Sequence, residues 1–306
     1  MVREPVYITG PTGCGKSALA VEAAMALGGE IINADAFQVY QGMEILTAQP
    51  SLEDKERVPH HLYGFLPAFE EFDAARFGAL AKLKIAEVQR RGNLPIVVGG
   101  SGLYIKGLTH GLADLPQVDL ELRAKLADSS LEELLPQLLK LDPEAETHVN
   151  LRNPRHVQRA LEICLLTGKP ASSFKQAWKE ERELPRGVFL NLERAELYAR
   201  INQRTHAMFS AGVVDEVNHL TENSGIEGQD VPPLCGLSKT AGKAIGLREI
   251  LSGMDSASMI EAIQQATRRY AKRQITWFKR ETYFTPVSTA AEALQLIMEF
   301  AAKPTP

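Results

Sequence analysis

The first third of the chain alternates short apolar runs with longer stretches of helical periodicity. The apolar runs at 6–9, 30–35 and 94–98 have the length and composition of buried strands. Between them, 16–27 and 74–91 repeat apolar residues every three or four positions, which is typical of amphipathic helices. Strands and helices that alternate in this order predict parallel crossover units. We therefore expect an α/β fold with a doubly wound parallel sheet.

Strand signals end near residue 116 and return only at 187–191. The periodicity between these points predicts helices, at 119–127, 131–141 and 154–167. A length of 306 residues exceeds that of a typical single domain, which agrees with an insertion. We expect a catalytic core formed by residues 1–115 and 186–306, with residues 116–185 as an inserted helical subdomain.

The pattern is helical again over most of the carboxyl-terminal part of the chain. It predicts helices at 196–211, 214–222, 242–251 and 259–279. The last of these leads into a basic stretch, because residues 268–280 contain six arginines and lysines and no acidic residue. Taken alone, this stretch suits a solvated helix face as well as a surface that meets nucleic-acid phosphates.

Composition and charge narrow the class of protein. Hydrophobic residues make up 44% and charged residues 24% of the chain, as in ordinary globular proteins, and no apolar run suits a signal core or a membrane span. The cysteines Cys14, Cys164 and Cys235 are widely spaced, and His60 and His61 have no third ligand nearby. We therefore expect reduced thiols, a cytoplasmic protein and no structural zinc. No heptad seam predicts self-association, so we expect a monomer.

Residues 10–17 carry the most specific motif. They match G-x-x-x-x-G-K-[ST], directly after a predicted strand and at the start of a predicted helix. The backbone N–H groups of such a loop and the positive end of the helix cradle a diphosphate. Lys16 is expected to hold a phosphoryl oxygen, and the Ser17 hydroxyl to complete a Mg²⁺ shell. The predicted diphosphate site thus contains Gly10, Pro11, Thr12, Gly13, Cys14, Gly15, Lys16 and Ser17.

This loop reads phosphates rather than bases, so other residues must identify the ligand. The Asn-Lys-x-Asp motif by which GTPases read guanine is absent, which excludes that class. An ATP-driven enzyme is expected to have a second apolar strand that ends in a metal-holding aspartate, but the strand at 94–98 ends in Gly99 and Gly100. Asp35, at the end of its own strand, suits either of two roles, a metal-holding acid or a catalytic base.

Further motifs follow the glycine loop in order: Asp35 to Met43, Pro59 to Leu62, Val98 to Tyr104, Gln158 to Glu162, Arg200 to Arg204, Lys243 to Glu249 and Tyr270 to Trp277. Together they cover most of the chain and resemble the transfer-RNA dimethylallyltransferases. The resemblance implies transfer of a dimethylallyl group from dimethylallyl diphosphate to N6 of the adenosine 3′-adjacent to the anticodon of tRNA. It also implies that diphosphate is released and that Mg²⁺ is required.

The resemblance also implies roles for single residues. Asp35 is expected to receive the proton of the attacking amine, and the Ser101 hydroxyl to assist near the leaving group. Arg204, or Arg200 one helical turn earlier, is expected to reach the diphosphate. The implied contacts with tRNA are Asp35, Ala36, Phe37, Gln38, Ser101, Arg123, Gln158, Arg159, Ala160, Leu161, Glu162, Gly246, Leu247 and Arg248. Ala36, Ser101 and Leu247 depart from the usual serine, threonine and tyrosine of that family.

Three other functions stay open at this stage. An adenylate dimethylallyltransferase, which prenylates the free nucleotide, would share the glycine loop and Asp35, but the predicted insertion and the basic helix argue against it. A small-molecule kinase would use Asp35 as a base with ATP in the loop, but the motifs after residue 40 argue against it. A non-catalytic RNA-binding module that senses nucleotides would not require a carboxylate at position 35.

Overall fold

The computed structural model describes residues 2–111, 119–174, 185–222 and 236–302. A six-stranded sheet has the order β3-β2-β4-β1-β5-β6, and every neighbouring pair is parallel. The strands are β1 (Val6–Thr9), β2 (Gly29–Asn33), β3 (His60–His61), β4 (Leu94–Gly99), β5 (Arg186–Leu190) and β6 (Thr285–Val287). The expected α/β fold with a doubly wound parallel sheet is confirmed.

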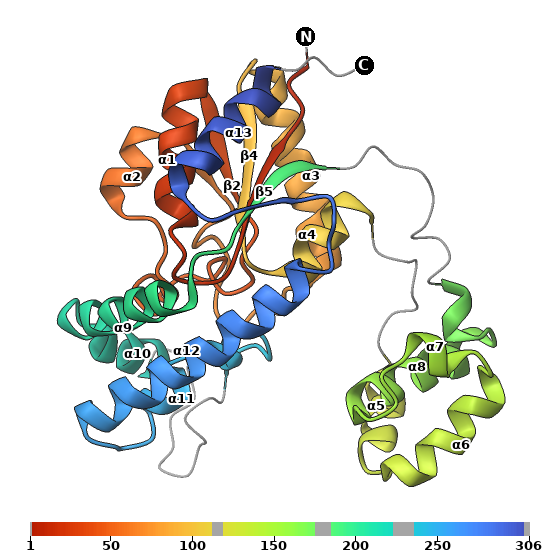
Figure 1. Ribbon diagram of the computed structural model, residues 1–306. Coiled ribbons are helices and arrows are strands. Elements are labelled where there is room, and N and C mark those ends of the chain that lie inside the picture. Colours follow the sequence, from red (N-terminus) through yellow and green to blue (C-terminus); the bar gives the residue numbers. More distant parts are fainter. Residues whose placement is uncertain (1, 112–118, 175–184, 223–235, 303–306) are drawn as a thin grey trace. The chain divides into compact units, whose positions relative to one another are not determined.

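Helices cover both faces of this sheet. The chain steps outward from β1 to β2 through α1 (Lys16–Leu27) and returns inward from β3 to β4 through α3 (Ala74–Arg90). Since such crossovers are right-handed, steps in opposite directions place α1 and α3 on opposite faces. The helix α13 (Ala290–Ala302) packs beside α1, and α4 (Gly102–Thr109) packs beside α3 (Figure 1).

A second group of helices lies beyond the carboxyl ends of the strands, as Figure 1 shows. It contains α9 (Arg194–Ser210), α10 (Val213–Glu222), α11 (Leu247–Ile250) and α12 (Ser256–Phe278). The continuous helix expected at 242–251 is wrong, because Gly246 has a φ of 103° and separates a short 3₁₀ turn at Ala241–Lys243 from α11. A further short helix, α2 (Leu52–Arg57), precedes β3.

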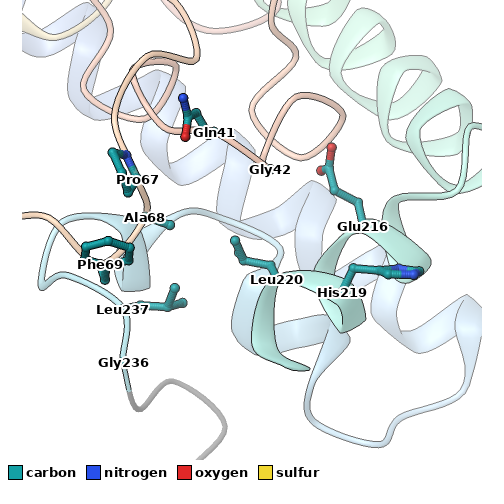
Figure 2. Close-up of a pocket in the computed structure, with 10 residues that line it drawn as sticks. All are labelled: Gln41, Gly42, Pro67, Ala68, Phe69, Glu216, His219, Leu220, Gly236 and Leu237. Atoms are coloured by element: carbon teal, nitrogen blue, oxygen red, sulfur yellow. The ribbon is translucent and has the colours of Figure 1, made fainter. Parts of the chain in front are cut away.

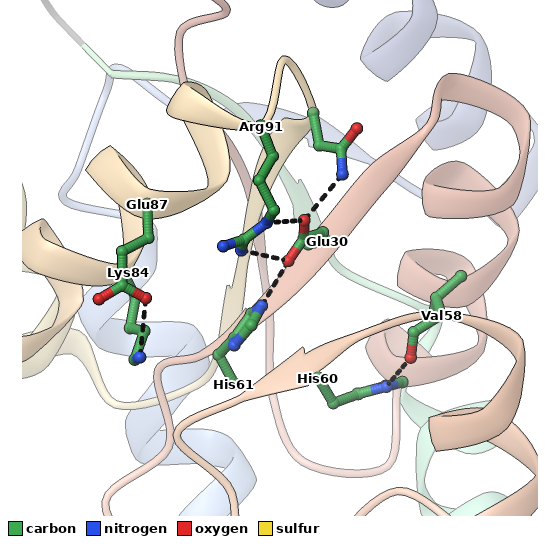
Figure 3. Close-up of polar contacts among 8 residues, drawn as sticks. Glu30, Val58, His60, His61, Lys84, Glu87 and Arg91 are labelled. Atoms are coloured by element: carbon green, nitrogen blue, oxygen red, sulfur yellow. Dashed lines mark hydrogen bonds and ion pairs between the residues drawn. The ribbon is translucent and has the colours of Figure 1, made fainter.

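A buried carboxylate fixes the amino-terminal half of β2 (Figure 3). Glu30 accepts hydrogen bonds from Nε and Nη2 of Arg91 at 2.8 and 2.7 Å and from the Asn93 amide at 2.8 Å. Its other partner is the His61 ring at 2.6 Å, while the His60 ring bonds instead to the Val58 carbonyl. The hydrogen bonds from Arg91 lower the pKa of Glu30 to about 2. The two histidines are therefore structural.

The inserted helices form a compact unit of their own. The core unit contains Met1–Thr109 and Leu184–Pro306, and the helical unit contains His110–Glu183. The boundaries predicted from the sequence are 115/116 and 185/186. The helical unit contains α5 (Leu120–Ala127), α6 (Leu131–Leu141), α7 (Ala145–His148) and α8 (Pro154–Thr167). Among the described residues, no helix combines the length and apolarity that crossing a membrane requires.

Candidate active site

The glycine loop connects β1 to α1 at the carboxyl edge of the sheet. Gly13 and Gly15 have φ values of 84° and 95°, in the left-handed region that side chains rarely adopt. A Cβ atom on Gly13 would lie 2.9 Å from the Ile201 side chain, so α9 packs closely enough to exclude any other residue. The Lys16 ammonium donates to the Pro11 carbonyl at 2.7 Å. It therefore lies beside the loop whose N–H groups are expected to bind the diphosphate.

A polar pocket of about 310 Å³ runs along this loop. Its walls come from the glycine loop, the ends of β2 and β4, the segment after Asp35, and α9. The ionisable and hydroxyl groups that line it include Lys16, Ser17, Asp35, Arg200 and Arg204. The structure thus brings together most of the residues predicted to act on the diphosphate, and it places Asp35 among them.

Asp35 lies two residues beyond the end of β2 and is partly exposed to the pocket. Its Oδ1 accepts a hydrogen bond from the Phe37 backbone N–H at 3.0 Å. Burial raises the pKa of this carboxyl above its ordinary value, and the Phe37 N–H and the positive charges of Lys16 and Arg204 oppose that rise only in part. A carboxylate with a raised pKa is the better proton acceptor.

The glycines at the end of β4 allow the end of β2 to approach. A Cβ atom on Gly99 would lie 2.1 Å from the Ala34 carbonyl oxygen, so no side chain, and no metal-holding aspartate, fits there. Ser101 follows two residues later, and its Oγ accepts from the Ala36 N–H at 2.9 Å. The replacement of serine by alanine at position 36 leaves this backbone bond in place.

Ser101 therefore supports the segment that carries Asp35. Ser101 is not among the described residues that line the polar pocket. The Tyr270 hydroxyl also interacts with the Ser101 side chain. The role expected for Ser101 near the leaving group stays a prediction, and the geometry favours an effect through Ala36.

Arg204 and Arg200 lie one turn apart on α9, and both line the polar pocket. Arg204 donates from Nη2 to the Thr12 hydroxyl at 2.9 Å, which ties it to the loop. Arg200 pairs with Glu196 at 2.7 Å and reaches only the Cys14 carbonyl, at 3.5 Å. This geometry favours Arg204 as the arginine that binds the diphosphate.

A smaller pocket of about 50 Å³ adjoins the polar one, and we name it the apolar pocket because most of the residues that line it alone are aliphatic or aromatic. The two share Thr12, Asp35, Thr47 and Arg204. The remaining walls of the apolar pocket are Phe37, Leu46, Met208, Ala244, Ile245, Ile263, Thr267 and Tyr270. Apart from Phe37, none of these is a site residue that the sequence predicts. Only Ala244, Ile245 and Tyr270 lie in a motif that pointed to them, because the others occupy apolar positions that any helix or loop can contain.

A third cavity of about 480 Å³, drawn in Figure 2, shares no described lining residue with the two pockets described above. Glu216 of α10 lines that cavity, and its two oxygens accept from the Ile45 and Leu46 N–H groups, both at 2.7 Å. Gln38, which lines the polar pocket, donates from its amide to the Thr47 and Ala48 carbonyls at 3.0 and 2.7 Å. Gln38, an expected tRNA contact, therefore already holds the segment 45–48 in place.

In the helical unit, a buried acid organises the expected RNA contacts. Glu162 is 2% exposed, and Arg123 and Arg159 each approach its Oε2 at 2.8 Å. Burial alone would raise the pKa of Glu162, but the hydrogen bonds and charges of the two arginines outweigh it and hold the pKa below its ordinary value. The two guanidinium groups remain partly exposed, with side chains 43% and 31% accessible.

The other expected contacts differ in exposure. Ala160 and Leu161 belong to the hydrophobic core of the helical unit, so within that stretch Gln158 and Arg159 offer the accessible polar groups. In the core unit, Gly246 and Leu247 are buried while Arg248 is exposed. The leucine that replaces the usual tyrosine is thus a core residue in this protein.

Comparison with known proteins agrees with these motifs. The model of the IPP transferase family matches residues 38–281. A tRNA dimethylallyltransferase of Geobacter metallireducens is 42% identical over 287 residues, which is 90% of each chain. The crystal structure of a tRNA isopentenylpyrophosphate transferase from Bacillus halodurans aligns with a TM-score of 0.67 at 33% identity and covers 98% of this chain and 97% of its own.

A eukaryotic dimethylallyltransferase acting on tRNA, also a solved structure, aligns with a TM-score of 0.79 at 28% identity and covers 95% of this chain and 75% of its own. Both the sequence match and the structural match extend over nearly the whole chain. The protein therefore belongs to the IPP transferase family.

Proposed function

We propose that this protein is a tRNA dimethylallyltransferase, which moves the dimethylallyl group of dimethylallyl diphosphate to N6 of the adenosine 3′-adjacent to the anticodon. One observation carries the proposal. The polar pocket combines the glycine loop and the cationic side chains Lys16, Arg200 and Arg204 with Asp35, whose pKa is raised, and it adjoins the apolar pocket. These are the groups that a prenyl transfer from a diphosphate to an amine requires.

The diphosphate is proposed to lie along the N–H groups of the glycine loop. Lys16 and Arg204 face the same pocket and offset the charge that develops on the leaving oxygen. The Ser17 hydroxyl lines that pocket as well. A single hydroxyl suits Mg²⁺, which takes few protein ligands and is bound mainly by substrate phosphates, where it neutralises their charge. The described residues contain no cluster of three acidic, histidine or cysteine ligands that would suit another kind of metal site.

The apolar pocket is the proposed place of the five-carbon tail. Leu46, Met208 and Ile263 contribute hydrocarbon walls, and transfer of the tail from water to these walls is favourable. Because the two pockets share Thr12, Asp35, Thr47 and Arg204, the carbon that joins tail to diphosphate lies beside Asp35. This places the electrophilic carbon next to the proposed base.

The reaction exchanges one bond for another. The C1–O bond of the donor breaks and its electron pair leaves with the diphosphate, while the N6 nitrogen of adenine bonds to C1. Asp35 takes the proton that this nitrogen loses. An adenine amine is a poor nucleophile because its lone pair is delocalised into the ring, so removal of the proton and stabilisation of the leaving group both lower the barrier.

The acceptor is proposed to be RNA rather than a free nucleotide. Arg269, Lys272, Arg273, Lys279 and Arg280 are exposed on and just after α12. The helical unit adds Arg123 and Arg159, both partly exposed. Such cations bind phosphates along an RNA backbone, and a single-stranded loop lets a base leave its stack for chemistry.

We further propose a monomer that acts in the cytoplasm. Cys14 and Cys164 are buried free thiols, as expected for a reducing compartment, and Cys235 lies outside the described residues.

One assay tests the proposed function. The protein is incubated with Mg²⁺ and labelled dimethylallyl diphosphate, with either tRNA or AMP as acceptor, and a parallel reaction measures phosphate transfer from ATP. Label is expected to enter tRNA alone. Label in AMP would identify an adenylate dimethylallyltransferase, and phosphate transfer without prenyl transfer would identify a kinase.

A further inference from the structure

Gln274 is a buried polar residue that belongs to neither pocket. It lies on α12, is 5% exposed and has both ends of its amide engaged. Its Oε1 accepts from the Thr12 backbone N–H at 2.8 Å, and its Nε2 donates to the Gly100 carbonyl at 2.9 Å. One side chain thereby joins the glycine loop after β1 to the end of the neighbouring strand β4.

The packing around Gln274 leaves little freedom. A Cβ atom on Gly100 would lie 2.2 Å from Gln274 Nε2, so the amide fills the space that the glycine leaves. The Thr12 N–H that it holds belongs to the residue whose hydroxyl accepts from Arg204 at 2.9 Å. Loss of the amide would therefore disturb both the loop backbone and the arginine that faces the diphosphate.

The hydrogen bond from Gln274 to Gly100 also lies close to the segment that carries Asp35. Gly100 precedes Ser101, whose Oγ holds the Ala36 N–H next to Asp35. Tyr270, one turn before Gln274 on α12, interacts through its hydroxyl with the side chains of Ser101 and Gln274 and lines the apolar pocket. A single helix thus contacts the loop for the leaving group and the segment that carries the base.

We propose that Gln274 is a positioning residue for diphosphate binding: it fixes the Thr12 end of the glycine loop against the end of β4. Gln274 does not contact the reacting atoms and acts through Thr12 and Arg204. This inference rests on the proposed function only where KM values are measured. The affinity for inorganic diphosphate can be measured without any prenyl transfer.

The test compares Gln274→Met, which keeps the length of the side chain and removes both hydrogen bonds, with Gln265→Met, an exposed glutamine of the same helix. Calorimetry measures the affinity for inorganic diphosphate with Mg²⁺. The affinity is expected to fall about ten- to a hundredfold in Gln274→Met, since an unpaired buried N–H costs that much, and to stay unchanged in Gln265→Met. KM for dimethylallyl diphosphate rises by the same factor, while KM for tRNA does not change.

A merely structural role gives another pattern, in which the melting temperature and the active fraction fall but diphosphate affinity and both KM values stay as in the wild type. That pattern overturns the proposal. If Gln274→Met does not fold, Gln274→Asn decides, because it keeps an uncharged amide but is one carbon shorter and cannot reach both Thr12 and Gly100. Wild-type diphosphate affinity in the asparagine variant also overturns it. A wild-type protein that binds diphosphate but prenylates no acceptor refutes the proposed function alone.

Discussion

The pockets of the core unit and the proposed RNA-binding surface of the helical unit hold their polar groups in different ways. In the core, Lys16 and Asp35 lie in segments that follow strand ends. Glycine conformations shape the loop before Lys16, and hydrogen bonds from the Thr12 and Phe37 N–H groups hold the two segments. In the helical unit, Arg123 and Arg159 are positioned by their side chains on one buried acid, Glu162. The backbone thus positions the proposed catalytic residues, whereas ion pairs position the proposed RNA contacts. Substitutions in the first region should change turnover and donor binding, and those in the second should change RNA affinity.

The largest expected effect comes from Asp35→Asn. Asparagine keeps the acceptor for the Phe37 N–H but cannot take a proton, so kcat is expected to fall about a hundredfold or more with diphosphate affinity retained. Steady-state kinetics and calorimetry measure the two quantities. Wild-type kcat in this variant would remove Asp35 from the mechanism.

The raised pKa of Asp35 adds a stability and a pH prediction. A carboxyl whose folded pKa lies above its unfolded value destabilises the fold once both states are ionised, so Asp35→Asn should melt at a higher temperature than the wild type at pH 7. In the wild type, activity should rise with pH through that raised pKa, because the base must be ionised. A lower melting temperature for the variant at pH 7 contradicts the proposed burial penalty.

Arg204→Ala and Arg200→Ala form the next pair. Arg204 is bonded to the loop through Thr12, so its loss should raise KM for the donor about ten- to a hundredfold. Arg200 shares its guanidinium with exposed Glu196, so its loss should raise KM by about threefold or less. Equal effects of the two substitutions would show that the hydrogen bond to Thr12 does not determine which arginine binds the diphosphate.

The sequence predicts well where one local signal decides the structure. Helices 131–141 and 154–167 begin and end at the residues expected, because Ser130 and Asn153 cap their starts and Gly168 adopts a left-handed φ of 67° after the second. The motif at 10–17 predicts the glycine loop, and the strand end before Asp35 predicts a site residue there. By contrast, β3 and β6 have two and three residues, too few for a periodic pattern.

The remaining site residues depend on tertiary contacts that no local pattern reveals. Gln274 is an ordinary glutamine in a helical stretch until the fold brings Thr12 and Gly100 to its amide. Glu216 likewise reads as a surface acid, yet it holds the Ile45 and Leu46 N–H groups. Leu161 lies in a motif expected to contact tRNA, but it is fully buried. Only the packing of α8 in the helical unit shows this.

In the helical unit, Arg159→Ala should affect RNA alone. KM for tRNA is expected to rise about fivefold, since one phosphate contact is worth roughly 1 kcal/mol, and the slope of log Kd against log salt should fall by about one. The donor KM should stay constant, as should both values in Lys140→Ala, an exposed lysine on α6 of the same unit. A changed donor KM in Arg159→Ala would break the distinction between the two regions.

Glu30→Gln should have the smallest effect on activity, although Glu30 resembles Glu162 as a buried acid held by arginine. It lies toward the amino-terminal end of β2 and contacts Arg91, Asn93 and His61, none of which lines the active-site pockets. The variant should lose about 1–3 kcal/mol of unfolding free energy at pH 7 while kcat and both KM values stay unchanged. Urea titration with parallel kinetics measures this.

The pH dependence of this loss identifies its cause. Because Arg91 lowers the pKa of Glu30 from 4.5 to about 2, the stabilisation is complete above pH 4.5 and disappears as the pH falls toward 2. The difference between wild type and variant should therefore shrink between about pH 5 and pH 3. A constant difference over that range would assign the loss to packing rather than to charge. A fall in kcat at pH 7 would show that the two ends of β2 are coupled. It would contradict the expectation that Glu30 affects only the stability of the core unit and not its chemistry.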